Sequence, residues 1–218
     1  MNLEYILKTV KRKVQDSSYD DDDYINWINE CIGQIASEEN LPDLVTYDRI
    51  IIRAGEYSDS RPDDYHSGLF HAYNNTKNRK VRVFNSLTEF LEKYPGLNEN
   101  GDVESIVVSG EDILGMYVPD QDQEIRIWYY REPEYLNNPN DILPSYIPRQ
   151  LHAVLFVNYC CMQAYSEIED GVGESMPNFE KYSLLYEEAR NSLRTFLGVP
   201  DESPDFVSDS GKENLEDE

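Results

Sequence analysis

Apolar residues recur every three or four positions at both ends of the chain, whereas the middle carries short extended runs. Residues 3–14 have this helical spacing, and so does a second stretch that follows the acidic run at 20–23 and ends at Leu41-Pro42. Carboxylates in a first helical turn complement the positive end of the helix dipole, and one of them can cap it. The pattern therefore predicts an αα-hairpin within residues 1–44.

The middle of the chain, residues 45–142, has the pattern of a β-rich insertion. Its β-branched or aromatic runs are residues 47–53, 69–73, 80–84, 103–108, 116–118 and 124–130. Turn-forming residues bound most of these runs, as expected for strands. One helix should interrupt them, because Ser86 and Glu89 have the spacing of a capping box and Pro95-Gly96 ends the apolar stretch that follows.

The helical period returns for the last third of the chain. Residues 147–168 predict a long helix that is apolar nearly all round at its centre, and such a helix is surrounded by other elements or by neighbouring subunits. The side chains that we expect to pack within or between subunits are Val154, Phe156, Val157 and Met162. A last helix over 178–197 ends at Gly198, a typical C-terminal cap. The predicted fold class is α+β: a helical scaffold of residues 1–44 and 143–198 around the β-rich insertion.

The last twenty residues, 199–218, form an acidic tail that we expect to be disordered on its own. They hold eight acids and one Lys, which is −7 of the formal charge of −24 and leaves −17 on the body. With 43 Asp and Glu against 19 Lys and Arg, the chain is not a typical non-specific nucleic-acid binder or a protein that docks on anionic lipid. An aromatic fraction of 12% nevertheless indicates a folded body.

Cysteines and targeting signals bear on where the protein is made. The cysteines are Cys31, Cys160 and Cys161. Their odd number and the lack of a C-x-x-C spacing indicate buried thiols in a reducing compartment. The N-terminus lacks the apolar core of a signal peptide, and the most apolar run, residues 153–165, is shorter than the roughly 20 residues of a membrane span. We expect cytoplasm-like conditions and no membrane contact.

No motif for catalysis or for cofactor binding emerges. The histidines, His66, His71 and His152, form no zinc set and no H-E-x-x-H pattern, so we expect them to be structural or exposed. The acidic run at 20–23 lacks the Gly and Glu of an EF-hand loop, which leaves a charged helix start. We therefore expect no metal site, no cofactor and no enzyme.

Two alternatives stay open. Glu167, Glu169 and Asp170 cluster at the end of the long helix, and paired carboxylates can act as acid and base, as in a carboxylate-based hydrolase. The aromatic residues 128–130 could stack on sugars, as in a glycan- or receptor-binding module of a virion. Stacking on bases would need basic partners as well, and without them we do not expect it.

Several short motifs occur in a fixed order along the chain. They are Leu3-x-x-x-Leu7 with Val10-x-Arg12, Ile28-Asn29-Glu30, Leu41-Pro42-x-Leu44, Arg61-Pro62-Asp63-Asp64-Tyr65, Tyr129-Tyr130-Arg131-Glu132-Pro133, Asp141-x-Leu143-Pro144 with Ile147-Pro148, and Glu169-Asp170. From residue 3 to residue 197, this ordered set resembles the head–tail adaptor (connector) proteins of tailed bacteriophages. Arg61 departs from the Leu of the family pattern, and the tail from Val199 has no family pattern to align with.

The resemblance implies a structural protein of the virion neck that is assembled in the host cytoplasm. Such proteins form rings, commonly of twelve copies, on the portal vertex, extend the DNA channel and offer a surface to tail or tail-completion proteins. Their C-terminal segments commonly dock on the portal. By that resemblance, the residues expected at the portal are Val199, Phe206, Val207 and Leu215. A rotationally closed interface makes such a ring, and an acidic lumen would let double-stranded DNA pass without tight binding.

Overall fold

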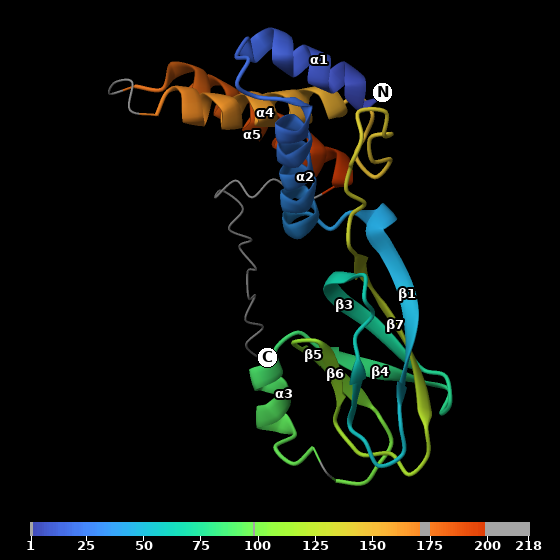
Figure 1. Cartoon of the computed structure of the whole chain (residues 1–218). Coiled ribbons are helices and arrows are strands. Elements are labelled where there is room, and N and C mark those ends of the chain that lie inside the picture. The colour runs from blue at the N-terminus through green and yellow to red at the C-terminus, as the bar shows by residue number, and fades with distance from the viewer. Residues whose placement is uncertain (1, 98, 171–174, 199–218) are drawn as a thin grey trace, which may run out of the picture.

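The computed structural model describes residues 2–97, 99–170 and 175–198, and it has the predicted α+β class. The helices are α1 (Leu3–Val14), α2 (Asp21–Glu38), the 3-10 helix η1 (Pro42–Leu44), α3 (Leu87–Lys93), α4 (His152–Ile168) and α5 (Pro177–Leu197). The strands are β1 (Val45–Ile52), β2 (Ser58–Ser60), β3 (Tyr65–Asn74), β4 (Arg79–Phe84), β5 (Ser105–Ser109), β6 (Asp112–Gly115) and β7 (Gln123–Arg131). Figure 1 shows a helical part and a β part at opposite ends of the molecule. The predicted tail and its four apolar residues lie outside the described residues.

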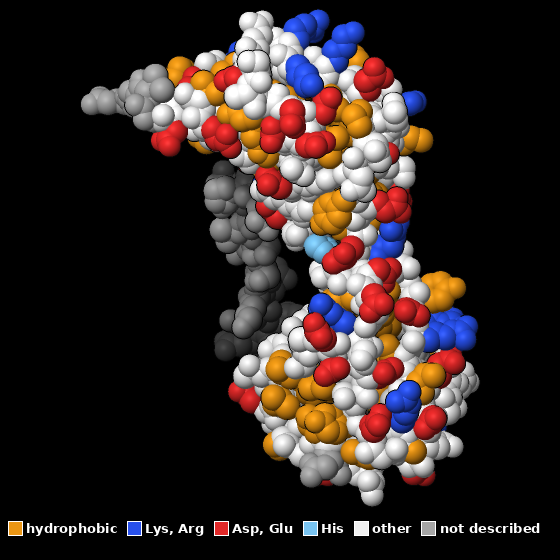
Figure 2. All heavy atoms as spheres, in the orientation of Figure 1, with side chains coloured by type: hydrophobic (Ala, Val, Ile, Leu, Met, Phe, Trp, Pro, Cys, Tyr) orange, Lys and Arg blue, Asp and Glu red, His pale blue; other side chains and the backbone are white. Residues whose placement is uncertain are grey.

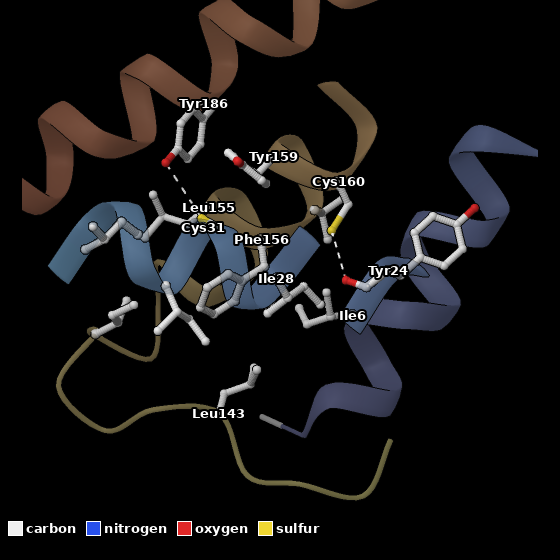
Figure 3. Close-up of a cluster of buried hydrophobic side chains, with 14 of the residues drawn as sticks. Ile6, Tyr24, Ile28, Cys31, Leu143, Leu155, Phe156, Tyr159, Cys160 and Tyr186 are labelled. Carbon is white, nitrogen blue, oxygen red and sulfur yellow. Dashed lines mark hydrogen bonds between the residues drawn. The ribbon is translucent and has the colours of Figure 1, made fainter. Parts of the chain in front are cut away.

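The apolar helix α4 forms the centre of the helical part. It packs against α1, α2 and α5, so elements of the same chain surround it on several sides. Figure 3 shows Leu155 and Phe156 of α4 in one cluster with Ile6 and Ile28 of the neighbouring helices, and all four side chains are completely buried. The all-round apolar character of this helix is therefore largely explained within one subunit.

The first two helices do not form the predicted αα-hairpin. Figure 1 shows α1 running across the picture and α2 running down it, and each packs mainly on α4 rather than on the other. The predicted cap of α2 is confirmed, because the Asp20 carboxylate accepts from the Asp23 N–H at 3.2 Å and the Asp23 carboxylate accepts from the Asp20 N–H at 2.8 Å. The sequence shows which face of α1 and of α2 is apolar, but it does not show what each face packs against. Here both apolar faces pack on a third helix, α4, about 130 residues later.

The start of α4 also differs from the prediction. We expected it at Ile147, and it begins at His152. The His152 ring Nε2 lies 2.8 Å from the Ile147 carbonyl and 3.1 Å from that of Pro144, and the Ile147 carbonyl is the one to which the Leu151 N–H would donate in an earlier helical turn. The Leu151 N–H instead donates to the Pro148 carbonyl at 2.8 Å, which makes a turn before the helix.

The sheet of the β part curls so that its edge strands meet. Its order is β1-β7-β3-β4-β5-β6-β2, and all neighbours are antiparallel except β4 and β5. In a flat sheet, a strand spacing of about 4.8 Å would place β1 and β2 about 29 Å apart. Residues 53–57 connect them directly, and at about 3.5 Å per residue this link is too short. The Ile51 N–H accordingly donates to the Asp59 carboxylate at 2.7 Å, and the sheet is an open barrel.

Two strands differ from the sequence prediction. β2 was missed because Ser58–Ser60 carries no apolar side chain. The run at 116–118 is not a strand, since β6 lies just before it. Ser109 pairs with Asp112, which leaves a two-residue loop with Gly110 at φ 63°, so the hairpin turn sets the position of β6.

The predicted short helix lies at the side of the barrel. α3 packs on β4 and β5, with Phe90 completely buried beside Phe84. Its predicted cap is present in part, because the Ser86 hydroxyl accepts from the Glu89 N–H at 3.3 Å. Among the helices in the described ranges, none has the length and apolarity of a bilayer span.

Candidate interaction surfaces

The two motifs that frame the β part in sequence contact each other in space. The Tyr129 hydroxyl donates to the Asp64 carboxylate at 2.5 Å, and the Glu132 N–H donates to the Asp64 carbonyl at 2.8 Å. The rings of Tyr65 and Tyr129 lie 5.4 Å apart, and the Arg61 guanidinium lies 5.4 Å from the Tyr65 ring. Burial and the Asp64 carboxylate raise the pKa of Tyr129. The contact fixes the end of β7 where the chain leaves the barrel.

A β-bulge lies beside this contact. The pairing of β3 with β7 shifts between Ser67 and His71, and Gly68 has φ +61°. A Cβ at Gly68 would come within 2.8 Å of the Tyr130 ring, so both the backbone angle and the close approach require glycine. The bulge turns the exposed Phe70 toward Tyr130, with ring centroids 5.5 Å apart.

The returning chain is attached to α2 by the side chain of one asparagine. The Asn29 amide donates to the Leu136 carbonyl and accepts from the Leu136 N–H, both at 2.8 Å. Leu136 is 5% exposed and belongs to the helical core, so the chain has already rejoined that part soon after β7 ends. The Ile28-Asn29-Glu30 motif thus anchors the link between the two parts.

An ion-pair cluster fastens the end of α5 to the end of α2. The Glu39 side chain is 5% exposed, and its carboxylate lies 2.5 Å from Arg194 Nε. Arg190, whose side chain is 10% exposed, contacts both Glu38 and Glu39. The hydrogen bond and the charge of Glu39 raise the pKa of Arg194. Because α2 leads through η1 into β1, the last turn of α5 lies at the side of the helical part from which the β part extends.

The four predicted subunit-packing residues have different environments. Phe156 is completely buried and Val157 is 3% exposed, and both belong to the core of their own subunit. Met162 is half-buried against that core. Val154 is 43% exposed at the start of α4, so it is the member of the set that is available to another chain.

Other exposed apolar side chains come from segments that contact the start of α4. Ile142, 83% exposed, lies beside Asn2 in an isolated β-bridge, and Tyr5, 54% exposed, follows one turn later on α1. The Pro144 carbonyl contacts His152, two residues before Val154. We call Tyr5, Ile142 and Val154 the apolar end of the helical part.

Two of the three acids considered for a hydrolase, Glu167 and Glu169, have structural partners. The Glu169 carboxylate accepts from the N–H groups of Asn178 and Phe179 and thereby caps α5. Desolvation opposes its ionisation, but these hydrogen bonds lower the pKa of Glu169 overall. Glu167 accepts from the Tyr19 hydroxyl at 2.9 Å. Each of these two contacts fixes secondary-structure elements, which favours the structural interpretation.

The cysteines also behave as structural residues. Cys31, Cys160 and Cys161 are free and buried, as predicted, and burial raises the pKa of Cys31 to about 12, which keeps the thiol protonated. Figure 3 shows Cys31 directed to the Tyr186 hydroxyl and Cys160 to the Tyr24 carbonyl. Across residues 2–97, 99–170 and 175–198, His, Cys, Asp and Glu form no group of three that could hold a metal ion.

Sequence reasoning missed a surface on the outer side of the barrel. The side chains of this cationic–aromatic face are Tyr47 and Arg49 on β1, Arg126 and Trp128 on β7, His71 and Tyr73 on β3, and Lys80 and Arg82 on β4. Strand register aligns them: Tyr47 and His71 both pair with Trp128, and Arg49 and Tyr73 both pair with Arg126. The Arg126 guanidinium lies 5.6 Å from the Tyr47 ring and 5.9 Å from the Trp128 ring. Basic partners for the aromatic residues are therefore present, contrary to the sequence interpretation.

The face continues into an open groove of about 640 Å3. Phe70, His71, Lys80, Arg82 and Glu104 are among its lining residues. Arg49 has an acidic neighbour, with 3.6 Å between its guanidinium and the Glu124 carboxylate. Within the described ranges, Lys80, Arg82 and Arg126 form no ion pair.

The comparisons with known proteins agree with the resemblance. No curated protein matches the chain. The family model described as "SU10 adaptor protein" matches residues 1–204, which include every described helix and strand. The chain therefore belongs to the SU10 adaptor protein family, a family of phage head–tail adaptors and virion structural proteins.

Proposed function

We propose that this adaptor forms a ring in the neck of the virion, between the portal and the tail, with the genome passing through its centre. Family membership supports the adaptor role. The separation of the molecule into a helical part and an open barrel supports a bridge, because each part offers its own surface to a different neighbour (Figure 1). The proposed ring has twelve copies, the number that is common among such proteins.

The apolar end of the helical part is the proposed contact between neighbouring subunits. Tyr5, Ile142 and Val154 are all more than 40% exposed, and they come from segments that contact the start of α4. Burying each such side chain is worth about 1.5–3 kcal/mol. A ring repeats this contact at every subunit, because a heterologous interface closes by rotation.

Residues 199–218 are the proposed portal-binding segment. The segment starts beyond Gly198 and carries an adjacent apolar pair, Phe206 and Val207, with Val199 and Leu215 at either side. Burial of such side chains in a portal pocket would offset the cost of ordering the segment. The β part is then free to face the tail proteins.

The charge of the chain suits a channel for DNA. At −24, the protein repels phosphate on average, so passing DNA would meet few contacts that hold it. Figure 2 shows acidic side chains scattered over both the helical and the β part of the visible face.

Mixing the purified chain with the portal of its own phage tests the proposal. We expect rings of the adaptor on the portal, visible by electron microscopy, and weaker portal binding after deletion of residues 199–218. A chain that stays monomeric and never joins the portal would contradict the adaptor function. Unchanged portal affinity after the deletion would contradict only the role of the tail.

A further inference from the structure

We propose that the cationic–aromatic face binds the acidic C-terminal segment of this chain, residues 199–218, from the same subunit or from its neighbour. The face gathers four of the 19 Lys and Arg on strands β1, β7 and β4 of a chain with 43 acids. At the right margin of Figure 2, Lys or Arg and hydrophobic side chains project together beside β1.

Charge identifies the occupant of the face. The segment has eight acids and one Lys, so its −7 complements the cations of Arg49, Lys80, Arg82 and Arg126. Three of these four form no ion pair within residues 2–97, 99–170 and 175–198, and a carboxylate-rich peptide would supply those partners. The exposed rings offer the apolar half of the contact, since Tyr47 is 60% and Phe70 is 50% exposed, and Phe206-Val207 of the segment can pack there.

The geometry of the chain allows this contact. The segment begins after Gly198, and the nearby Arg194 pairs with Glu39, at the side of the helical part from which the β part extends. Twenty extended residues reach about 70 Å, whereas an eight-residue strand is about 27 Å long. The segment can therefore reach the face.

Because the segment is covalently attached to the chain, even weak binding would be enough for it to occupy the face. A covalent tether of this length gives an effective concentration of about 1 mM, so a segment that binds with a Kd of about 1 mM as a free peptide would occupy the face half of the time. Because the attraction is between exposed charges, salt should release the segment. A portal that binds the same segment would compete with the face, although the proposal itself does not depend on the function in the neck.

Acrylamide quenching of Trp128 in the full-length chain tests the proposal, with Trp27→Phe removing the other tryptophan. Raising the salt to about 1 M, where the Debye length is about 3 Å, should increase the quenching constant by up to about twofold as the segment leaves a half-occupied face. A full-length variant with the eight tail acids changed to Asn and Gln should already show the high value at low salt. Lys80→Glu with Arg82→Glu should do the same, and Lys8→Glu with Arg12→Glu, which places equal charge changes on α1, should not.

Two results would overturn the proposal. One is a quenching constant at low salt that the neutral tail leaves unchanged, which would mean that the segment does not cover Trp128. The other is protection of Trp128 by double-stranded DNA in the full-length chain at low salt, which would assign the face to nucleic acid. Circular dichroism of each variant confirms that its fold is intact.

Discussion

Replacing Asn29 by Ala should destabilise the protein more than truncation of an exposed residue of α2. The Asn29 amide makes two hydrogen bonds of 2.8 Å with the backbone of Leu136, in a segment that has just left the barrel. Ala removes both hydrogen bonds and leaves the N–H and the carbonyl of Leu136, which is 5% exposed, without a partner. Water has little access to replace them.

The expected magnitude follows from those two groups. Leaving a buried hydrogen-bonding group unsatisfied costs about 1–3 kcal/mol, so the two together should lower the free energy of unfolding by about 2–4 kcal/mol, allowing for partial solvation. Asn29→Asp should rescue part of this, because a carboxylate can still accept from the Leu136 N–H but cannot donate to its carbonyl.

Urea denaturation followed by circular dichroism measures the effect. The matched control is Asn26→Ala, since Asn26 is exposed on the same helix one turn earlier, and it should change the free energy of unfolding by less than about 0.5 kcal/mol. If Asn29→Ala and Asn26→Ala were equally mild, the link between the two parts would not depend on this side chain, and the reasoning would be refuted.

Three further predictions concern the barrel, the core and the ring. Gly68→Ala should lower the free energy of unfolding by more than about 1–2 kcal/mol, because the new Cβ combines φ +61° with a 2.8 Å approach to the Tyr130 ring. Gly55→Ala, where φ is +84° and the space is open, should lower it by less. Equal losses for the two variants would contradict the packing argument. Burial raises the pKa of Tyr24 to about 12, so the folded state keeps a proton that the unfolded chain releases near pH 10. The contribution of Tyr24 to the free energy of unfolding should therefore be fully present below about pH 10 and fall toward pH 12. Tyr24→Phe should reduce that fall, measured by urea titrations at about pH 9 and 11. Val154→Glu should prevent ring formation in light scattering, whereas Leu184→Glu on exposed α5 should not; rings of Val154→Glu would remove this residue from the interface.

The helices were predictable because their signals are local. The apolar spacing of α1 and α5 and the Asp20 cap all lie within one or two turns of the residues they affect. The hairpin prediction failed because the packing partner of both α1 and α2 is α4, which no local pattern identifies. The late start of α4 has a similar cause, since it depends on where the His152 ring finds acceptors.

The cationic–aromatic face shows most clearly why part of the candidate site could not be predicted from the sequence. Arg126 and Trp128 are two apart on one strand, so their common side was visible in the alternation of β7. Lys80 lies more than 40 residues away, and only the pairing of β4 with β3 and of β3 with β7 brings it to the same side. Register across several strands is set by turns and bulges such as the one at Gly68, which composition and spacing do not reveal.

Electron microscopy of the purified chain mixed with its portal tests the adaptor account most directly. The account predicts a closed ring of this protein on the portal, with the helical parts in contact through the apolar end and an open central channel. Monomers that leave the portal bare, at concentrations where both proteins are folded, would contradict it.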